Sequence, residues 1–296
     1  MCDIDTEKAF MCKKEWNVRS YYVNYEEMLN NENIDILSIC TQPDSHEDIV
    51  IAAVKNGVKA IFCEKPISNN LNSANVIIHA CKKQNILLAI NHYRRWDRFY
   101  IKLKDDILNG VFGEIQHINF YYTRGISNSG SHMFDLLRYL FGEITSIQTF
   151  YRIEEILDDP TFSCNLIIDD NIPCNLIGLN GSHYRIFNLE VYGTLKSISI
   201  DTSKNIKIFK TVESTRSSEF KELVEQDHLY NSFLNEQYFL NSLTNIIDTF
   251  EQKNNLLCTG TDGLKSLELI IAAKLSYELQ TIIELPLKTN DYTKSI

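Results

Sequence analysis

Three short apolar runs separated by helical stretches constrain this fold more than any other feature of the sequence. The runs lie at 35–40, 59–63 and 86–90, and helices are predicted between them at 46–57 and 71–84. Strands that alternate with helices in this way form parallel βαβ crossovers. Each run is almost continuously apolar, which is typical of a sheet with helices on both faces. The first part of the chain is therefore predicted to contain a parallel sheet.

The pattern changes after a helix predicted at 97–109. Strands with polar alternation follow, at 115–122, 145–152, 163–169, 173–178, 186–192, 196–201 and 205–210. One helix at 131–141 interrupts them, and helices at 229–252 and 262–280 follow them. This alternation predicts a mostly antiparallel sheet, with one face on helices and the other facing water or a partner.

Composition excludes several classes of protein. A chain of 296 residues with 44% hydrophobic content is long enough for two packed domains. Its net charge of −10 and its scattered basic pairs argue against nucleic-acid binding, which needs a concentrated basic face. No stretch has the length of a membrane span, and the first residues lack the pattern of a signal peptide. We expect a soluble, cytoplasmic protein.

The eight cysteines are scattered without Cys-x-x-Cys spacing or nearby histidine pairs. Several lie inside apolar runs, so buried, reduced thiols are predicted. Neither a metal site nor a disulfide framework is expected, because the ligand spacing and the small secreted format are both missing.

Glu64-Lys65-Pro66 directly follows the apolar run at 59–63. A lysine at the carboxyl end of a buried strand lies where open α/β sheets bind ligands. It can share a proton with a substrate hydroxyl, while the proline fixes the turn, including through a cis peptide bond. On these three residues alone, a surface Glu-Lys pair before a turn proline is the commoner interpretation.

Short motifs nevertheless follow one another along nearly the whole chain, at 25–29, 41–46, 63–66, 91–96, 110–115, 130–137 and 259–264. In order and spacing they resemble the Gfo/Idh/MocA family of oxidoreductases. The resemblance implies an α/β fold: an incomplete Rossmann-type parallel sheet, then an α+β domain with a large, mostly antiparallel open sheet. The implied domains are 1–113, which binds the dinucleotide, and 114–296, which binds substrate and forms oligomer contacts.

The implied reaction is hydride transfer between a nicotinamide and a secondary alcohol of a sugar, sugar derivative or cyclitol. NAD is expected in preference to NADP, and a homodimer or homotetramer is expected to form through the open sheet. No nucleic-acid or membrane partner is implied.

The resemblance also implies roles for individual residues. Lys65 would hydrogen-bond the reacting oxygen, Glu64 and Pro66 would hold that lysine beside the nicotinamide, and His132 would be the second proton-handling residue. The remaining expected contacts are Asn128, Asp135, His92 and Arg95 with substrate, and Asp3, Thr41 and His46 with cofactor. Tyr121, Arg124 and Tyr184 are further candidate substrate contacts.

His132 also has a local argument. It falls in the first turn of the helix predicted at 131–141, where the positive end of the dipole lowers an imidazole pKa and favours the neutral form. Asp135 shares that helix face and could orient the ring. A packed interfacial histidine is the alternative. Asn91-His92 is similarly either a polar strand end or part of the pocket floor.

The sequence departs from the family pattern at Asn128, where many members have an aspartate four residues before the histidine. An amide can position a hydroxyl but cannot take its proton, so Lys65 or His132 would do that alone.

The second departure is that no Gly-x-Gly-x-x-Gly is present, and the first glycine is Gly57. The family's opening strand, glycine turn and helix take about 30 residues. Asp3 then aligns with the acid that binds the adenosine ribose, which favours NAD, although it could instead be a helix cap.

Loss of that central strand would leave its neighbours unpaired and remove a helix N-terminus from the pyrophosphate site. Two expectations follow. Either the sequence starts downstream of the true start, or the chain is a real truncation that has lost cofactor binding. The alternative to a dehydrogenase is a catalytically silent homologue that binds a sugar-like ligand or serves as an assembly subunit.

Overall fold

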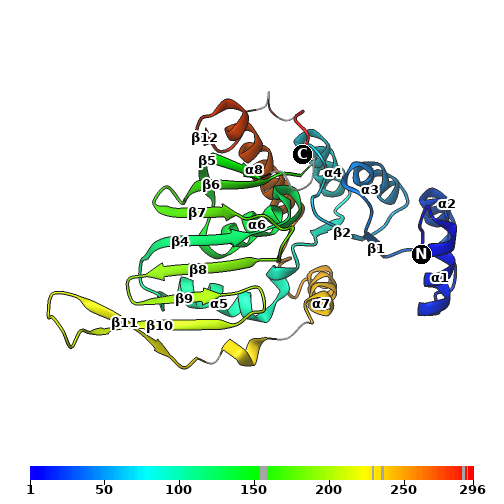
Figure 1. The fold of residues 1–296 in the computed structure, drawn as a ribbon. Coiled ribbons are helices and arrows are strands. Elements are labelled where there is room, and N and C mark those ends of the chain that lie inside the picture. Colours follow the sequence, from blue (N-terminus) through cyan, green and yellow to red (C-terminus); the bar gives the residue numbers. More distant parts are fainter. Residues whose placement is uncertain (154–158, 229, 235–236, 289–290, 292) are drawn as a thin grey trace.

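The computed structural model describes residues 1–153, 159–228, 230–234, 237–288, 291 and 293–296. Two sheets organise these residues (Figure 1). The first has the strand order β1-β2-β3, and the second has the order β11-β10-β9-β8-β4-β7-β6-β5-β12. The predicted α/β fold class, with a Rossmann-like parallel sheet before a large mixed sheet, is confirmed.

The small sheet is parallel throughout. Its elements are β1 (Ile36–Ile39), η1 (Pro43–Ser45), α3 (His46–Lys55), β2 (Ala60–Cys63), α4 (Leu71–Lys83) and β3 (Leu87–Ile90). β2 lies in the centre, and all its residues are buried. Because the strands are parallel, their carboxyl ends meet at one edge, where the segments after β2 and β3 begin.

The prediction that both faces of every strand in this sheet are covered is wrong for β1. Leu37 and Ile39 are buried there, but Ile36 and Ser38 are exposed. Among the described strands, β1 pairs with β2 alone. Beyond it lie α1 (Thr6–Trp16) and α2 (Tyr25–Asn31), whose flanking segments meet in one parallel bridge between Cys2 and Tyr22 (Figure 1).

The strands of the large sheet are β4 (Ile115–Tyr122), β5 (Ile144–Ile153), β6 (Thr161–Ile168), β7 (Ile172–Gly178), β8 (Phe187–Gly193), β9 (Lys196–Ile200), β10 (Ile206–Glu213), β11 (Lys221–Gln226) and β12 (Ile283–Glu284). Neighbours are antiparallel except β4 and β7. Burial alternates along β4. The helix α8 (Gly260–Leu279) packs against β5, and α6 (Ser131–Phe141) packs against α8. The prediction of one helix-covered face is confirmed.

The helix predicted at 229–252 is shorter than expected. The structure has a 3-10 turn, η4 (Tyr230–Phe233), and then α7 (Tyr238–Phe250). Residues 229, 235 and 236 of that prediction lie outside the described residues. β11 was not predicted, because its residues are mostly polar and exposed and show no clear alternation. Its pairing with β10 therefore depends on the backbone ladder rather than on burial.

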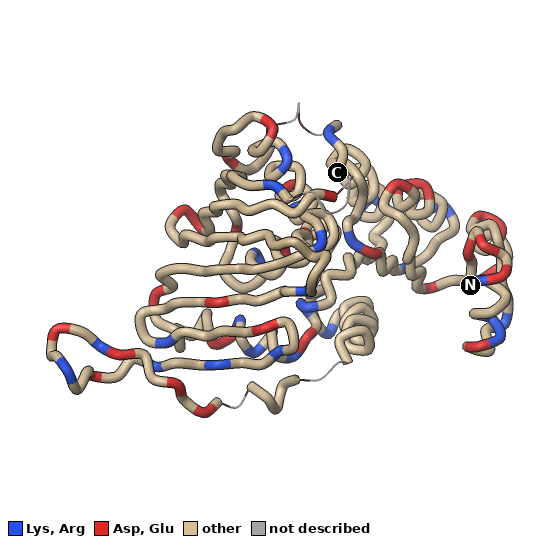
Figure 2. Tube along the Cα trace, in the orientation of Figure 1, with Lys and Arg blue, Asp and Glu red and all other residues tan. Residues whose placement is uncertain are grey.

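Lys and Arg are interspersed with Asp and Glu along the chain (Figure 2). In the described part of the chain, no helix combines the length and the apolar character needed to cross a bilayer.

Candidate active site

The carboxyl end of β2 carries the first part of the site. The Glu64 amide donates to the carbonyl of Ile39 (2.9 Å), and the Asn91 amide donates to the carbonyl of Cys63 (2.8 Å). The Asn91 side chain donates to Glu64 Oε1 (2.7 Å). These contacts join the three strand ends and fix the Glu64 carboxylate. The peptide bond that follows, Lys65-Pro66, is cis.

The Lys65 ammonium faces a segment far away in the sequence. Nζ donates to the backbone oxygen of Asn128 (3.0 Å) and to its side-chain Oδ1 (3.1 Å). Burial lowers the pKa of Lys65, against the opposing effects of the Glu64 and Asp159 carboxylates. A lysine with a lowered pKa exchanges its proton more readily near neutral pH than a solvated lysine does.

The Asp159 carboxylate shapes the segment that presents Asn128, a π-helical turn, η3 (Gly125–Gly130). It accepts hydrogen bonds from the backbone N–H groups of Ser127 (2.7 Å) and Asn128 (3.0 Å). Gly125 has φ +77°, and a Cβ there would lie 2.1 Å from Asp159 Oδ2. Only glycine allows the carboxylate to approach so closely, and the approach holds Asn128 toward Lys65.

His132 is the second residue of α6, as predicted. Its ring packs edge-on against those of His92 (centroids 5.7 Å apart) and Tyr93 (5.2 Å). The pKa of His132 lies well below its ordinary value, chiefly because of burial and then because of the nearby charge of Arg94. The predicted neutral form is therefore supported. The predicted cause is not, because η3 runs directly into α6 and moves the helical end away from His132.

His92 and Asn91 lie at the end of β3. His92 is 1% exposed, and burial lowers its pKa to about 4, so the ring is neutral at pH 7. Both ring nitrogens and Asn91 Oδ1 are buried without a hydrogen-bond partner among the described residues. Buried polar atoms of this kind are rare in native proteins, and each requires a specific explanation. Neither residue is part of the lining of the cavity that His132 lines, so the pocket-floor interpretation of Asn91-His92 stays a prediction.

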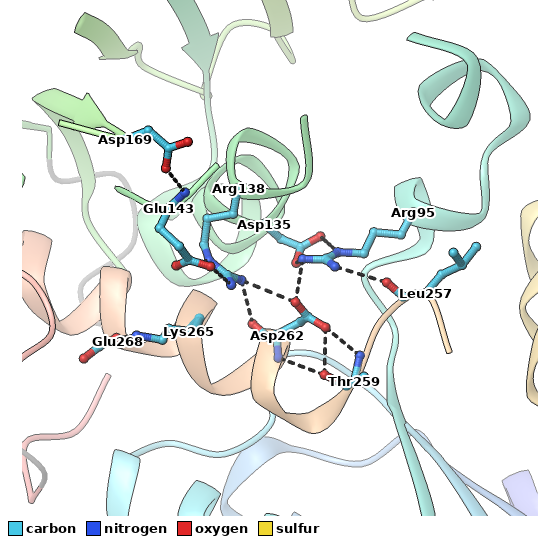
Figure 3. Close-up of polar contacts among 10 residues, drawn as sticks. All are labelled: Arg95, Asp135, Arg138, Glu143, Asp169, Leu257, Thr259, Asp262, Lys265 and Glu268. Atoms are coloured by element: carbon cyan, nitrogen blue, oxygen red, sulfur yellow. Dashed lines mark hydrogen bonds and ion pairs between the residues drawn. The ribbon is translucent and has the colours of Figure 1, made fainter. Parts of the chain in front are cut away.

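Arg95 and Asp135 belong to a buried ionic network rather than to the pocket (Figure 3). The Arg95 guanidinium bonds both oxygens of Asp135 (3.0 and 3.1 Å), and NH2 also reaches Asp262 (2.9 Å). Asp262 is shared with Arg138, which pairs with Glu143 (2.6 Å). We call these five residues the arginine network. The predicted orientation of His132 by Asp135 is wrong, because Arg95 engages that carboxylate, and direct substrate contact by Arg95 or Asp135 is not supported.

The three residues near the first strands that were predicted to contact the cofactor, Asp3, Thr41 and His46, have different environments. Asp3 accepts from the Asp5 amide (2.9 Å), and it is Asp5 that caps α1, so the helix-cap interpretation of Asp3 is wrong. Thr41 is exposed after β1. His46 is fully buried between the carbonyls of Ile67 and Thr41, each 3.1 Å from a ring nitrogen. It joins the loops after β1 and β2, so cofactor contact by its ring is not supported.

A cavity of about 330 Å³ lies beside these groups. Its walls come from η2 (Tyr93–Trp96), the 123–132 segment, residues 185–187 and the turn at 201–204. Asn128 and His132 line it; Lys65 is not part of the lining, but its ammonium hydrogen-bonds Asn128, which is. Of the further candidate contacts, Arg124 lines the cavity, whereas Tyr121 and Tyr184 do not.

Sequence patterns missed Arg94, Arg185, Lys204 and Asp159. Arg94 could have been found, because it lies in the motif at 91–96. The others lie in loops and turns with no periodicity, and only the folded chain brings them to the cavity or to Asn128.

Comparisons with known proteins bear on the family and the fold of this chain. Residues 1–92 match the Gfo/Idh/MocA model described as "Oxidoreductase family, NAD-binding Rossmann fold", and residues 125–285 match "Oxidoreductase family, C-terminal alpha/beta domain". The chain is 26% identical to myo-inositol 2-dehydrogenase of Thermotoga maritima, covering 96% of this chain and 89% of the relative. It is also 26% identical to scyllo-inositol 2-dehydrogenase (NAD(+)) of Bacillus subtilis, covering 95% and 86%.

Among solved structures, a levoglucosan dehydrogenase in complex with NADH and levoglucosan has a TM-score of 0.82 at 16% identity, covering 97% of this chain and 90% of that one. This likeness shows the fold. Together with the family matches, which include more than half of the sequence, it establishes that the chain belongs to the Gfo/Idh/MocA family of NAD-binding oxidoreductases.

Proposed function

We propose that this chain is an NAD-dependent dehydrogenase or ketoreductase acting on a secondary alcohol of a sugar, sugar derivative or cyclitol. One observation carries the proposal. The Lys65 ammonium faces Asn128, beside the neutral His132, at the carboxyl edge of the parallel sheet and next to a ligand-sized cavity. The two inositol dehydrogenases among its relatives support the substrate class.

The residues present fit the nicotinamide end of NAD. Glu64, Lys65 and Pro66 form a fixed turn, and the partnerless buried atoms of Asn91 and His92 offer hydrogen bonds to a polar group. NAD, when bound, supplies the acceptor or donor of the hydride. Asp3 is proposed for the adenosine ribose, in preference to a 2′-phosphate, because it is acidic. For the pyrophosphate, the sequence offers no glycine-rich turn.

The chain's own residues would handle the proton. We assign to Lys65 a hydrogen bond from Nζ to the reacting oxygen, which stabilises negative charge as it develops there. His132, being neutral, can accept the hydroxyl proton on a ring nitrogen. Asn128 would position the hydroxyl by hydrogen bonding without taking its proton.

A test is to incubate the chain with NAD and a panel of cyclitols and aldoses, and to follow NADH by absorbance. We expect oxidation of at least one member of the panel. Saturable binding of a sugar without any NADH formation would favour the second candidate, a catalytically silent homologue. That candidate is favoured by Asn128, whose amide replaces an acid group.

The proposal also includes the oligomeric state, the domain boundary and the cellular compartment. The partly exposed face of the large sheet, including Tyr192 (38% exposed), supports a homodimer or homotetramer through that face. The start of β4 at Ile115 supports the boundary between domains at 1–113 and 114–296. All eight cysteines are free thiols, which supports a reducing compartment, the cytoplasm.

A further inference from the structure

The cavity has a strongly cationic lining. Arg94, Arg124, Arg185 and Lys204 all contribute to it, each from a different wall segment. We call these four residues the cationic wall. Like charges around one small cavity repel one another, and the electric field that they share attracts anions.

The two carboxylates in the lining do not neutralise this wall. Asp97 is fully buried and is paired with Lys204 (2.7 Å), so it offsets that one charge. Asp201 accepts hydrogen bonds from the backbone of its own turn, at Ser203 (2.8 Å) and Asn205 (2.9 Å). In the described part of the chain, no carboxylate is within ion-pair distance of the three arginines.

Arg94 is held ready for a ligand. Its guanidinium carbon lies 3.7 Å from the centroid of the Phe187 ring and 4.6 Å from that of Tyr93. Stacking on two rings fixes the guanidinium plane. Its NH1 atom is nevertheless buried without a hydrogen-bond partner among the described residues. A buried N–H without a partner is costly, and an anionic oxygen would satisfy it.

Arg124 adds an independent observation. Its backbone has φ +74°, in the left-handed region that is unusual for any residue except glycine. Such conformations cost free energy and are concentrated at ligand and active sites. Arg124 immediately precedes η3, so the turn that presents Asn128 to Lys65 begins at a member of the cationic wall.

We infer that the substrate carries an anionic group, a carboxylate or a phosphate, which Arg94, Arg124 and Arg185 bind. A carboxylate has two oxygens in one plane, and a phosphate has its oxygens in a tetrahedral arrangement. In either group, two oxygens can accept the paired N–H groups of a guanidinium. The cavity of about 330 Å³ is at the small end of ligand pockets, so the substrate is a single sugar or cyclitol unit. The inference takes the substrate class, a sugar or cyclitol, from the proposed function, and adds that this substrate is negatively charged.

Calorimetric titration of the chain with matched sugars tests this inference without any need for turnover. Each set contains a neutral hexose, its uronate and its 6-phosphate, in the gluco and galacto series, with NAD present and with NAD absent. We expect at least one charged member to bind roughly tenfold or more tightly than its neutral partner, because charge-assisted hydrogen bonds are gained. Preference for the uronate or for the phosphate identifies the group.

Substitutions in the cationic wall test which residues cause the preference for a charged sugar. Arg94→Gln and Arg185→Gln should each reduce the charged-to-neutral affinity ratio roughly tenfold, because the affinity for the charged sugar falls much more than that for its neutral partner. Arg98→Gln is the matched control, because Arg98 is exposed at the start of α5 (Arg98–Leu108) and lies outside the cavity. It should leave the ratio unchanged. A cooperative thermal unfolding transition, followed by circular dichroism, reports whether a variant has folded.

The inference is overturned if no charged sugar binds more tightly than its neutral partner, or if Arg98→Gln lowers the ratio as much as the cavity variants do. Binding of charged sugars without NADH formation would refute the proposed function and leave this inference standing. Oxidation of neutral sugars, with no preference for charged ones, would support the proposed function and refute this inference.

Discussion

Arg94 and Arg95 are neighbours in the sequence, yet they belong to regions with opposite electrostatics. In the arginine network, Arg95 is buried against the carboxylates of Asp135 and Asp262. In the cationic wall, Arg94 stacks on aromatic rings, and the described residues provide no carboxylate for it. The arginine network pairs its charges internally, whereas in the cationic wall only Lys204 has a described carboxylate partner and the three arginines have none. The first region is therefore built for stability and the second for a ligand.

Breaking the arginine network should give the largest effect on stability. Asp135→Asn removes a carboxylate that is 1% exposed and leaves part of the Arg95 charge uncompensated. We expect the free energy of unfolding to fall by about 3 to 5 kcal/mol, measured by urea denaturation. Arg94→Gln should cost far less stability. Equal losses for the two variants would remove the distinction between the regions.

The pH dependence of stability should show the next largest effect. His92 has an ordinary pKa of 6.5, which burial lowers to about 4 in the folded protein. The unfolded chain therefore binds a proton first as pH falls, so stability is present above pH 6.5 and is lost toward pH 4. The loss from His92 is about 3 kcal/mol. His92→Gln should flatten this part of a denaturation series, and an unchanged slope would contradict it.

Asp159 should affect activity more than stability. Asp159→Asn weakens the bonds to the backbone of Ser127 and Asn128 and removes a charge that raises the Lys65 pKa. We expect a roughly tenfold lower turnover, equivalent to one charged hydrogen bond. The alkaline limb of the pH–rate profile should move to lower pH, because Lys65 then loses its proton more easily. Asp170→Asn, in the exposed turn after β6, is the control, and a limb that does not move argues for a purely structural Asp159.

The smallest effect is expected at the outer end of the arginine network. The Glu143 side chain is 56% exposed, and water screens its pair with Arg138. Glu143→Gln should change the unfolding free energy by about 1 kcal/mol or less, again measured in urea. A loss as large as that of Asp135→Asn would mean that the network acts as one buried unit up to its exposed end.

The part of the site next to the small sheet was predictable from sequence. Apolar runs locate β2 and β3, and a residue directly after a parallel strand must lie at the carboxyl edge, which places Glu64, Lys65 and His92. The helix that carries His132 has a clear apolar period, so its start was also predictable.

The rest depends on contacts between distant residues. Lys65 meets Asn128 across 63 positions, and Asp159 meets the same residue across 31. No local pattern encodes such pairings. His46 shows the same limit of local patterns. It follows a strand, as a cofactor-binding residue would, but its ring nitrogens contact the backbone carbonyls of Ile67 and Thr41.

The most direct test of the proposed chemistry is Lys65→Met, assayed with the sugar or cyclitol that the chain oxidises best. We expect turnover to fall by about 10² to 10⁴, with NADH binding, measured by fluorescence, left as it is in the unchanged chain. Lys83→Met, an exposed lysine at the end of α4, serves as the control and should have normal turnover. Turnover that survives Lys65→Met would contradict the assignment of Lys65 to the reacting oxygen.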